Sequence, residues 1–104
     1  MRALLLLMLM PLMPAKAEQP VIKCPGNTTH EMRKCALKRR DESEAALEKK
    51  LSPETLKQWR EATMEVCSAA YRPYLQGTIY PQLVDGCDDR LNRVLLEEWN
   101  RMGE

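Results

Sequence analysis

Aromatic side chains and catalytic groups are both scarce in this sequence. It has no phenylalanine, two tryptophans, three tyrosines and a single histidine, His30. A Cys–His nucleophile pair would require a free thiol, and the many carboxylates stand beside Lys and Arg, as on a solvated helix face. A chain this small is also poorly suited to hold a cleft. We therefore expect a protein that is not an enzyme.

Metal-binding and redox motifs are missing as well. The four cysteines, Cys24, Cys35, Cys67 and Cys87, are too far apart to form the close Cys or His pairs that zinc sites use. They include no C-x-x-C pair, so a thiol–disulfide redox centre is not expected. The sequence thus predicts no metal and no other cofactor.

Long apolar runs are absent except at the N-terminus. Arg2 precedes about eleven apolar residues, and Ala15 and Ala17 supply the small side chains that a signal peptidase reads. A membrane span needs roughly twenty apolar residues, so the run fits a cleavable signal better than a retained anchor. We predict a signal peptide over residues 1–17, no stable membrane span after its cleavage, and a periplasmic or secreted protein.

The chain also lacks an excess of basic charge. It has 16 Lys and Arg against 15 Asp and Glu, and the predicted signal peptide contains Arg2 and Lys16. Removal of the signal leaves the mature chain slightly acidic, with His30 neutral. Nucleic acid is therefore not an expected partner, and any recognition must depend on a local surface.

The rest of the chain is dominated by helical patterns. Residues 18–28 form an irregular N-terminal segment that contains Pro and Gly, and residues 29–102 form one helical domain. Apolar residues recur at helical spacing over 29–50, 53–72 and 87–102, and only a short Thr-Ile-Tyr run alternates like a strand. The predicted fold class is all-α: a compact three-helix domain stapled by two disulfides.

Capping residues support the first two of these helices. Thr28 with Glu31 three residues later fits a capping box. Ser52 followed by Pro53 fits a helix start, because Ser is a good N-cap and Pro is tolerated at the first helical position.

Two disulfides are expected for four cysteines in a small exported chain. Four cysteines allow three connectivities, and we favour the local one. A bond between Cys24 and Cys35 would hold the N-terminal segment to the first helix. A bond between Cys67 and Cys87 would close the intervening loop at both ends. Each bond would stabilise the fold by roughly 2–4 kcal/mol, mainly by restricting the unfolded chain.

Residues 71–86 stand apart because they hold every tyrosine, two prolines and two glycines. We predict an irregular loop there. In one interpretation Tyr71 and Tyr74 pack on the two tryptophans, and the loop is a structural corner. In the other, the loop is a rigid binding edge, because tyrosine offers a large contact area for little conformational entropy. The candidate partner-binding residues of this loop are Tyr74, Thr78, Ile79 and Tyr80.

The order of motifs resembles a known family. "EMRKCA" surrounds the second cysteine, Trp59 and Cys67 are separated by seven residues, and "LQGTIYPQLVDGC" ends on the last cysteine. Over residues 24–99 the chain resembles the LprI-type lysozyme-inhibitor domain, a family of small exported bacterial helical domains. It departs from the family's usual residues at Glu44, Leu47, Glu48, Leu51, Thr63 and Leu95.

The resemblance implies a binding module that protects the cell envelope by blocking lysozyme, with a lysozyme or another cell-wall enzyme as its protein partner. Since a lysozyme is a basic protein, the resemblance also makes Asp85 a candidate partner-binding residue, with Asp88 and Asp89 adding negative charge from the first turn of the last helix. The alternative is a structural or stress-related envelope protein that inhibits no lysozyme and uses its helices for self-association or for a membrane protein partner. An exposed apolar stripe on the last helix would favour the alternative. An exposed tyrosine loop above a buried stripe would favour the inhibitor.

Overall fold

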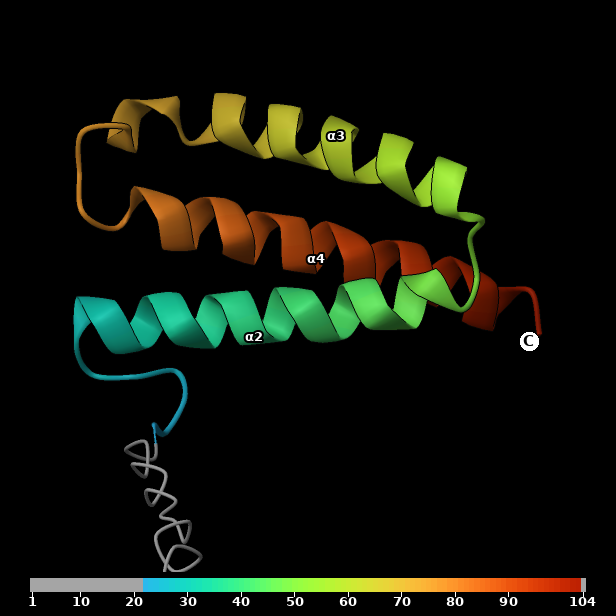
Figure 1. Cartoon of the computed structure of the whole chain (residues 1–104), viewed down its shortest axis with the longest axis horizontal. Helices are drawn as coiled ribbons and strands as arrows, with labels where there is room; N and C mark the ends of the chain where they lie inside the picture. Colours follow the sequence, from blue (N-terminus) through green and yellow to red (C-terminus); the bar gives the residue numbers. More distant parts are fainter. Residues whose placement is uncertain (1–21, 104) are drawn as a thin grey trace, which may run out of the picture.

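The described part of the chain is all-helical (Figure 1). A computed structural model describes residues 22–103. These residues form three α-helices and a short 3₁₀ helix, and no strand. The elements are α2 (Thr29–Glu48), α3 (Pro53–Ala70), η1 (Arg72–Tyr74) and α4 (Tyr80–Arg101). The predicted all-α, three-helix fold class is therefore confirmed.

The first two helices begin where their capping residues indicate. The Thr28 hydroxyl accepts a hydrogen bond from Glu31 N at 3.1 Å, and the Ser52 hydroxyl accepts one from Thr55 N at 3.2 Å. Pro53 lies in the first turn of α3, where its missing N–H has no helical partner to lose. The predicted starts are confirmed, and each helix ends two residues earlier than predicted.

The third helix starts earlier than the sequence pattern predicted. α4 begins at Tyr80 rather than at Cys87, so the irregular connection ends at Ile79. Pro81 lies in the first turn of α4, where a fixed backbone angle and a missing N–H suit a helix. The prediction was wrong because Pro81 and Gly86 were both interpreted as parts of a loop. Cys87 and the two aspartates after it consequently lie inside the helix, away from its positive N-terminal end.

Both predicted disulfides are present, and all four cysteines are paired. Cys24 and Cys35 join the N-terminal segment to α2, and Cys67 and Cys87 join α3 to α4, with Cα–Cα distances of 5.6 and 5.8 Å. Disulfides persist in oxidising compartments outside the cytoplasm. None of the described helices is long and apolar enough to cross a membrane. The predicted signal peptide, residues 1–17, lies outside the described residues.

α4 packs against both other helices, whereas α2 and α3 touch each other little (Figure 1). A buried amide joins all three. Trp59 Nε1 of α3 donates to Asn92 Oδ1 of α4 at 2.7 Å. Asn92 Nδ2 in turn donates to Ser43 Oγ of α2 at 2.9 Å. The buried apolar side chains around this polar centre are Cys35, Leu47, Leu56, Cys67 and Val84.

The predicted apolar face of the last helix is only partly buried. Leu91, Leu95 and Trp99 are half-buried, but Val94 is 58 % exposed and Met102 is 67 % exposed. The most buried positions of α4 after its first turn are instead polar, so part of the apolar stripe remains at the surface.

Candidate functional site

The connection between α3 and α4 is ordered by successive turns. Tyr74 N donates to Tyr71 O at 2.9 Å, and Gly77 N donates to Tyr74 O at 2.8 Å. The bond between Cys67 and Cys87 holds the two flanking helices together on either side of these turns. A segment held in this way loses little conformational entropy when it meets a partner.

The exposed part of the tyrosine segment, residues 71–80, centres on Tyr74 and Leu75. Tyr74 is 49 % exposed and Leu75 is 51 % exposed, and Thr78 is exposed beside them. Ile79 and Tyr80 are half-buried where α4 begins. Sequence reasoning missed Leu75, because a single leucine in an irregular segment carries no periodic signal of its exposure.

Tyr71 anchors the segment to α4. Its hydroxyl accepts a hydrogen bond from Arg90 Nη2 at 3.1 Å, and its ring centroid lies 6.2 Å from that of Tyr74. Within the described residues, the rings of Tyr71 and Tyr74 contact each other rather than a tryptophan ring. The Trp59 ring instead donates a hydrogen bond to Asn92. Tyr71 therefore has a structural role, while Tyr74 presents an exposed ring.

Asp85 faces α2 rather than solvent. Its side chain is 13 % exposed, and its Oδ1 accepts a hydrogen bond from Arg40 Nη1 at 2.9 Å. Asp88 and Asp89 are also buried, at 5 % and 4 % exposed. The negative surface expected beside the loop is therefore not formed by these residues. They are buried because α4 begins before Pro81 and turns this stretch into its packed face.

A chain of ion pairs crosses all three helices beside the buried amide. Arg40 of α2 bonds to Asp85 of α4, and its Nε lies 3.9 Å from Glu44 Oε2. The other oxygen of Glu44 accepts a hydrogen bond from Arg60 Nε of α3 at 3.2 Å. The pairs between helices join residues far apart in sequence, so no local charge pattern could reveal them.

Asp88 is the least well satisfied carboxylate of this core. Its Oδ1 is buried without a hydrogen-bond partner. Burial raises the pKa of Asp88 above its ordinary value of 3.8, although a hydrogen bond with Thr63 and the charge of Arg40 act in the opposite direction. Burial likewise raises the pKa of Asp85 against the lowering effect of Arg40. Both groups therefore bear on stability rather than on contact with a partner.

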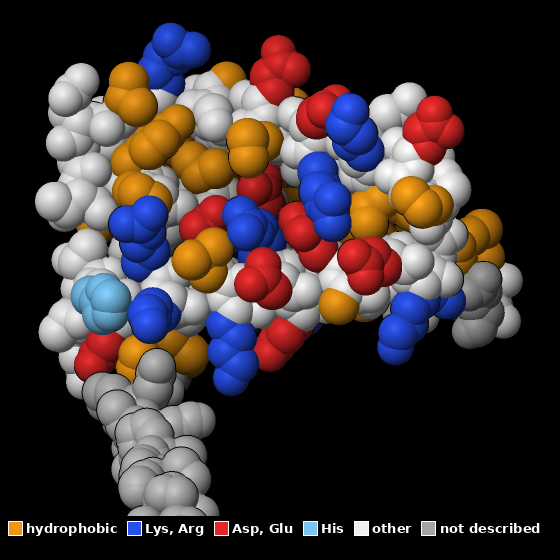
Figure 2. Space-filling view, in the orientation of Figure 1, with side chains coloured by type: hydrophobic (Ala, Val, Ile, Leu, Met, Phe, Trp, Pro, Cys, Tyr) orange, Lys and Arg blue, Asp and Glu red, His pale blue; other side chains and the backbone are white. Residues whose placement is uncertain are grey.

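Apolar and charged side chains occupy different parts of the molecular surface. Hydrophobic side chains gather near the end where α3 leads into α4, whereas Lys and Arg alternate with Asp and Glu across the middle (Figure 2). Within residues 22–103, the His, Cys, Asp and Glu side chains form no group of three that could hold a metal ion. The exposed tyrosine turn lies at this same end, where α3 leads into α4 (Figure 1).

No family model, curated protein or solved structure matches the chain. The resemblance to the LprI-type lysozyme-inhibitor domain therefore stays a prediction that rests on the motifs alone.

Proposed function

We propose that this protein is a periplasmic or secreted binding module that attaches to a protein partner through the tyrosine segment, residues 71–80. The observation that carries the proposal is the exposure of Tyr74 and Leu75 on a turn whose flanking helices are cross-linked. Aromatic and aliphatic side chains on a pre-ordered turn supply contact area at a low entropic cost. A lysozyme is the first partner to test, because the order of motifs resembles the LprI-type inhibitor domain.

The position of the segment suits a concave partner. η1 and the residues after it form the connection at one end of the three-helix domain, opposite the C-terminus (Figure 1). A narrow end with two exposed apolar side chains fits an enzyme cleft better than a flat helix face does. Because Asp85 and its neighbours turn inward, we expect the contact to depend on apolar area and to change little with ionic strength.

Inhibition of lysozyme by the oxidised protein that lacks residues 1–17 tests the proposal. The described fold lies within residues 22–103, so this form keeps every contact described above. We expect saturable inhibition of at least one lysozyme type, and its loss after reduction of the disulfides. Absence of inhibition across lysozyme types, with both disulfides intact, would exclude lysozyme and leave other envelope proteins to be sought by pull-down.

Surface variants locate the contact. Tyr74→Ala and Leu75→Ala should each raise the inhibition constant by about tenfold, since central apolar contacts carry most of the binding energy of an interface. Met102→Ala is the matched control, because Met102 is an exposed apolar side chain near the other end of the domain. Equal inhibition by all three variants would remove the tyrosine segment from the proposal.

One observation favours the alternative function of self-association. Val66 on α3 and Val94 on α4 are each 58 % exposed, so an apolar stripe does remain on the helices. Sedimentation velocity at increasing concentration distinguishes the two functions. A dimer that dissociates in the Val94→Glu variant would favour a self-associating envelope protein, whereas a monomer at all concentrations would favour the binding module.

A further inference from the structure

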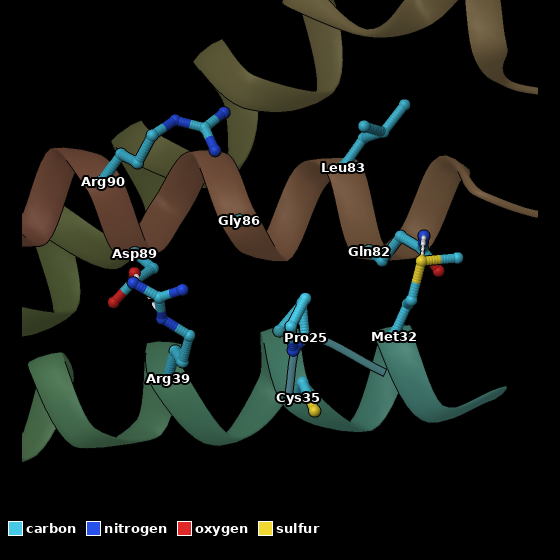
Figure 3. Close-up of a pocket in the computed structure, with 10 residues that line it drawn as sticks. Pro25, Met32, Cys35, Arg39, Gln82, Leu83, Gly86, Asp89 and Arg90 are labelled. Carbon is cyan, nitrogen blue, oxygen red and sulfur yellow. Dashed lines mark hydrogen bonds and ion pairs between the residues drawn. The ribbon is translucent and has the colours of Figure 1, made fainter. Parts of the chain in front are cut away.

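A groove runs between α2 and α4 beside the first disulfide (Figure 3). Its volume is about 360 Å³, which lies within the range of small-ligand sites. It is open to solvent, and its lining residues include neither Asn92 nor a tyrosine; Arg90 of the lining contacts the tyrosine segment through the Tyr71 hydroxyl. Its apolar lining comes from Pro25, Met32, Cys35, Ala36 and Leu83.

Gly86 keeps the groove open. It lies on the α4 wall between Leu83 and Arg90 (Figure 3). A Cβ at this position would come within 3.4 Å of Arg90 Nη1, and a longer side chain would project into the groove. A glycine inside a helix destabilises that helix relative to alanine. The space that Gly86 leaves in the groove is a reason for a glycine at this position.

Arg90 of α4 and Arg39 of α2 line the same end of the groove, and their guanidinium groups point to different sides of the α4 ribbon (Figure 3). Arg90 donates to the Tyr71 hydroxyl but, within the described part of the chain, has no carboxylate within 4.0 Å. Arg39 lies 4.0 Å from Asp89 Oδ2 and is 62 % exposed. Asp89 is already bound at 2.9 Å by Arg93 Nε. Guanidinium charge therefore exceeds carboxylate charge at this end, which fits an anionic group.

The other end of the groove holds an unsatisfied acceptor. Gln82 Oε1 is buried without a hydrogen-bond partner, while Gln82 Nε2 lies 3.9 Å from Met32 Sδ. A buried carbonyl oxygen without a donor costs free energy, and an N–H from a ligand would satisfy it. Gln82 and Arg90 are separated by about 12 Å along the axis of α4, a span that roughly three to four extended residues cover.

We infer that this groove binds the carboxyl-terminal end of a peptide whose last residue is apolar. The terminal carboxylate bonds to Arg90, the apolar side chain lies over Gly86, and a backbone N–H donates to Gln82 Oε1 when the Gln82 amide turns toward the groove. A chain terminus supplies this anion, apolar group and N–H donor together, whereas a fatty acid has no donor. The inference stands on the groove alone and does not depend on inhibition of lysozyme.

Fluorescence anisotropy with a labelled tripeptide that ends in leucine tests the inference on the oxidised protein lacking residues 1–17. The peptide with a free carboxylate should bind at least about tenfold more tightly than its C-terminal amide, because charge-assisted hydrogen bonds to a guanidinium are strong. Octanoate should displace the peptide at least about tenfold less well than the unlabelled peptide does. Equal binding of acid and amide, no binding of either, or displacement by octanoate at the concentration of the peptide would each overturn the inference.

Two variants place the peptide in the groove. Gly86→Leu should abolish binding by filling the space, and it should fold, since leucine favours a helix more than glycine does. Arg90→Gln should weaken binding of the acid by about tenfold and leave binding of the amide unchanged. Arg101→Gln removes an exposed arginine from the last turn of α4 and should change neither. Unaltered binding to Gly86→Leu, with circular dichroism confirming the fold, would place the peptide elsewhere and contradict the inference.

Discussion

At the scale of single residues, Asn92 has the most consequential position in the molecule. Asn92 is 2 % exposed, and its side-chain amide hydrogen-bonds to both neighbouring helices, to Trp59 of α3 and to Ser43 of α2. A buried amide between helices is stabilising only while both of its partners are satisfied. The amide of Asn92 is therefore a point at which one substitution affects all three helices.

Replacing Asn92 by Ala should lower the free energy of unfolding by about 2–4 kcal/mol, because Trp59 Nε1 and the Ser43 hydroxyl both lose a buried partner and a cavity remains. Urea denaturation of the oxidised protein measures this loss. Asn100→Ala, at an exposed position of the same helix, is the control and should change stability by less than about 0.5 kcal/mol. Similar effects of the two variants would mean that the buried amide is not important to the fold.

The titration of Asp88 should make the folded state less stable as the pH rises, which is the opposite of the usual effect of a carboxylate with a lowered pKa. Burial raises the pKa of Asp88 in the folded protein above the ordinary 3.8 that applies to the unfolded chain. The folded state then binds more protons, so the contribution of Asp88 is fully present below pH 3.8 and is lost as the pH rises through the folded pKa. At neutral pH the ionised carboxylate therefore destabilises the fold.

Asp88→Asn should accordingly have a higher urea midpoint than the parent protein at about pH 7, and the difference should shrink toward about pH 4. Paired urea titrations at the two pH values measure it. Asp41→Asn, whose carboxylate is 68 % exposed, is the control and should show little difference at either pH. A lower midpoint for Asp88→Asn at neutral pH would show that the ionised carboxylate is stabilising instead.

Burial of these aspartates could not be read from the sequence. Asp85 and Asp88 stand in a charged, irregular-looking stretch, and such stretches usually belong to a solvated surface. What buries them is packing against α2 and α3, whose contributing residues, Arg40 and Thr63, are distant in sequence. The disulfide pairing was predicted correctly for the opposite reason, because each bond joins segments that are close in sequence, at separations of 11 and 20 residues.

At the scale of elements, a helix start was predictable where a side chain marks it. Thr28 and Ser52 cap α2 and α3 through their hydroxyls, and both starts followed from the sequence. Ile79 precedes α4 without a side-chain cap, so nothing polar marks that start. Pro81 was the available signal, because proline is favoured in the first turn of a helix. The tyrosine segment is shorter than predicted for this reason.

α3 is the element that depends most on a disulfide, since it packs on α4 and touches α2 little. Replacing Cys67 and Cys87 together by Ala should cost about 3 kcal/mol and should speed amide hydrogen exchange throughout α3. Replacing Cys24 and Cys35 together by Ala is the matched comparison. It should speed exchange in the first turns of α2 and leave α3 protected. Hydrogen-exchange mass spectrometry resolves the two patterns, and identical patterns would contradict the separate roles of the bonds.

At the scale of the whole molecule, the core is too polar to carry the fold by itself. Within residues 22–103, the buried side chains include as many polar as apolar ones, and the buried leucines are Leu47 and Leu56. A small domain has a net stability of about 5–15 kcal/mol, so two disulfides worth roughly 2–4 kcal/mol each are a large share of it. The protein thus combines a polar interior, which fixes how the helices meet, with cross-links that supply much of the stability.

Reduction of both disulfides should therefore abolish cooperative folding near 37 °C, while the oxidised protein should unfold in a single transition at a higher temperature. Circular dichroism melts with and without a phosphine reductant measure this, and thiol counting confirms that reduction is complete. The control is a sample that is reduced in the same buffer and then reoxidised after the reductant is removed. It should regain its unfolding transition. An unchanged melting temperature in fully reduced protein would mean that the helices hold together without the cross-links, and that the buried amide and ion pairs stabilise the fold far more than their geometry indicates.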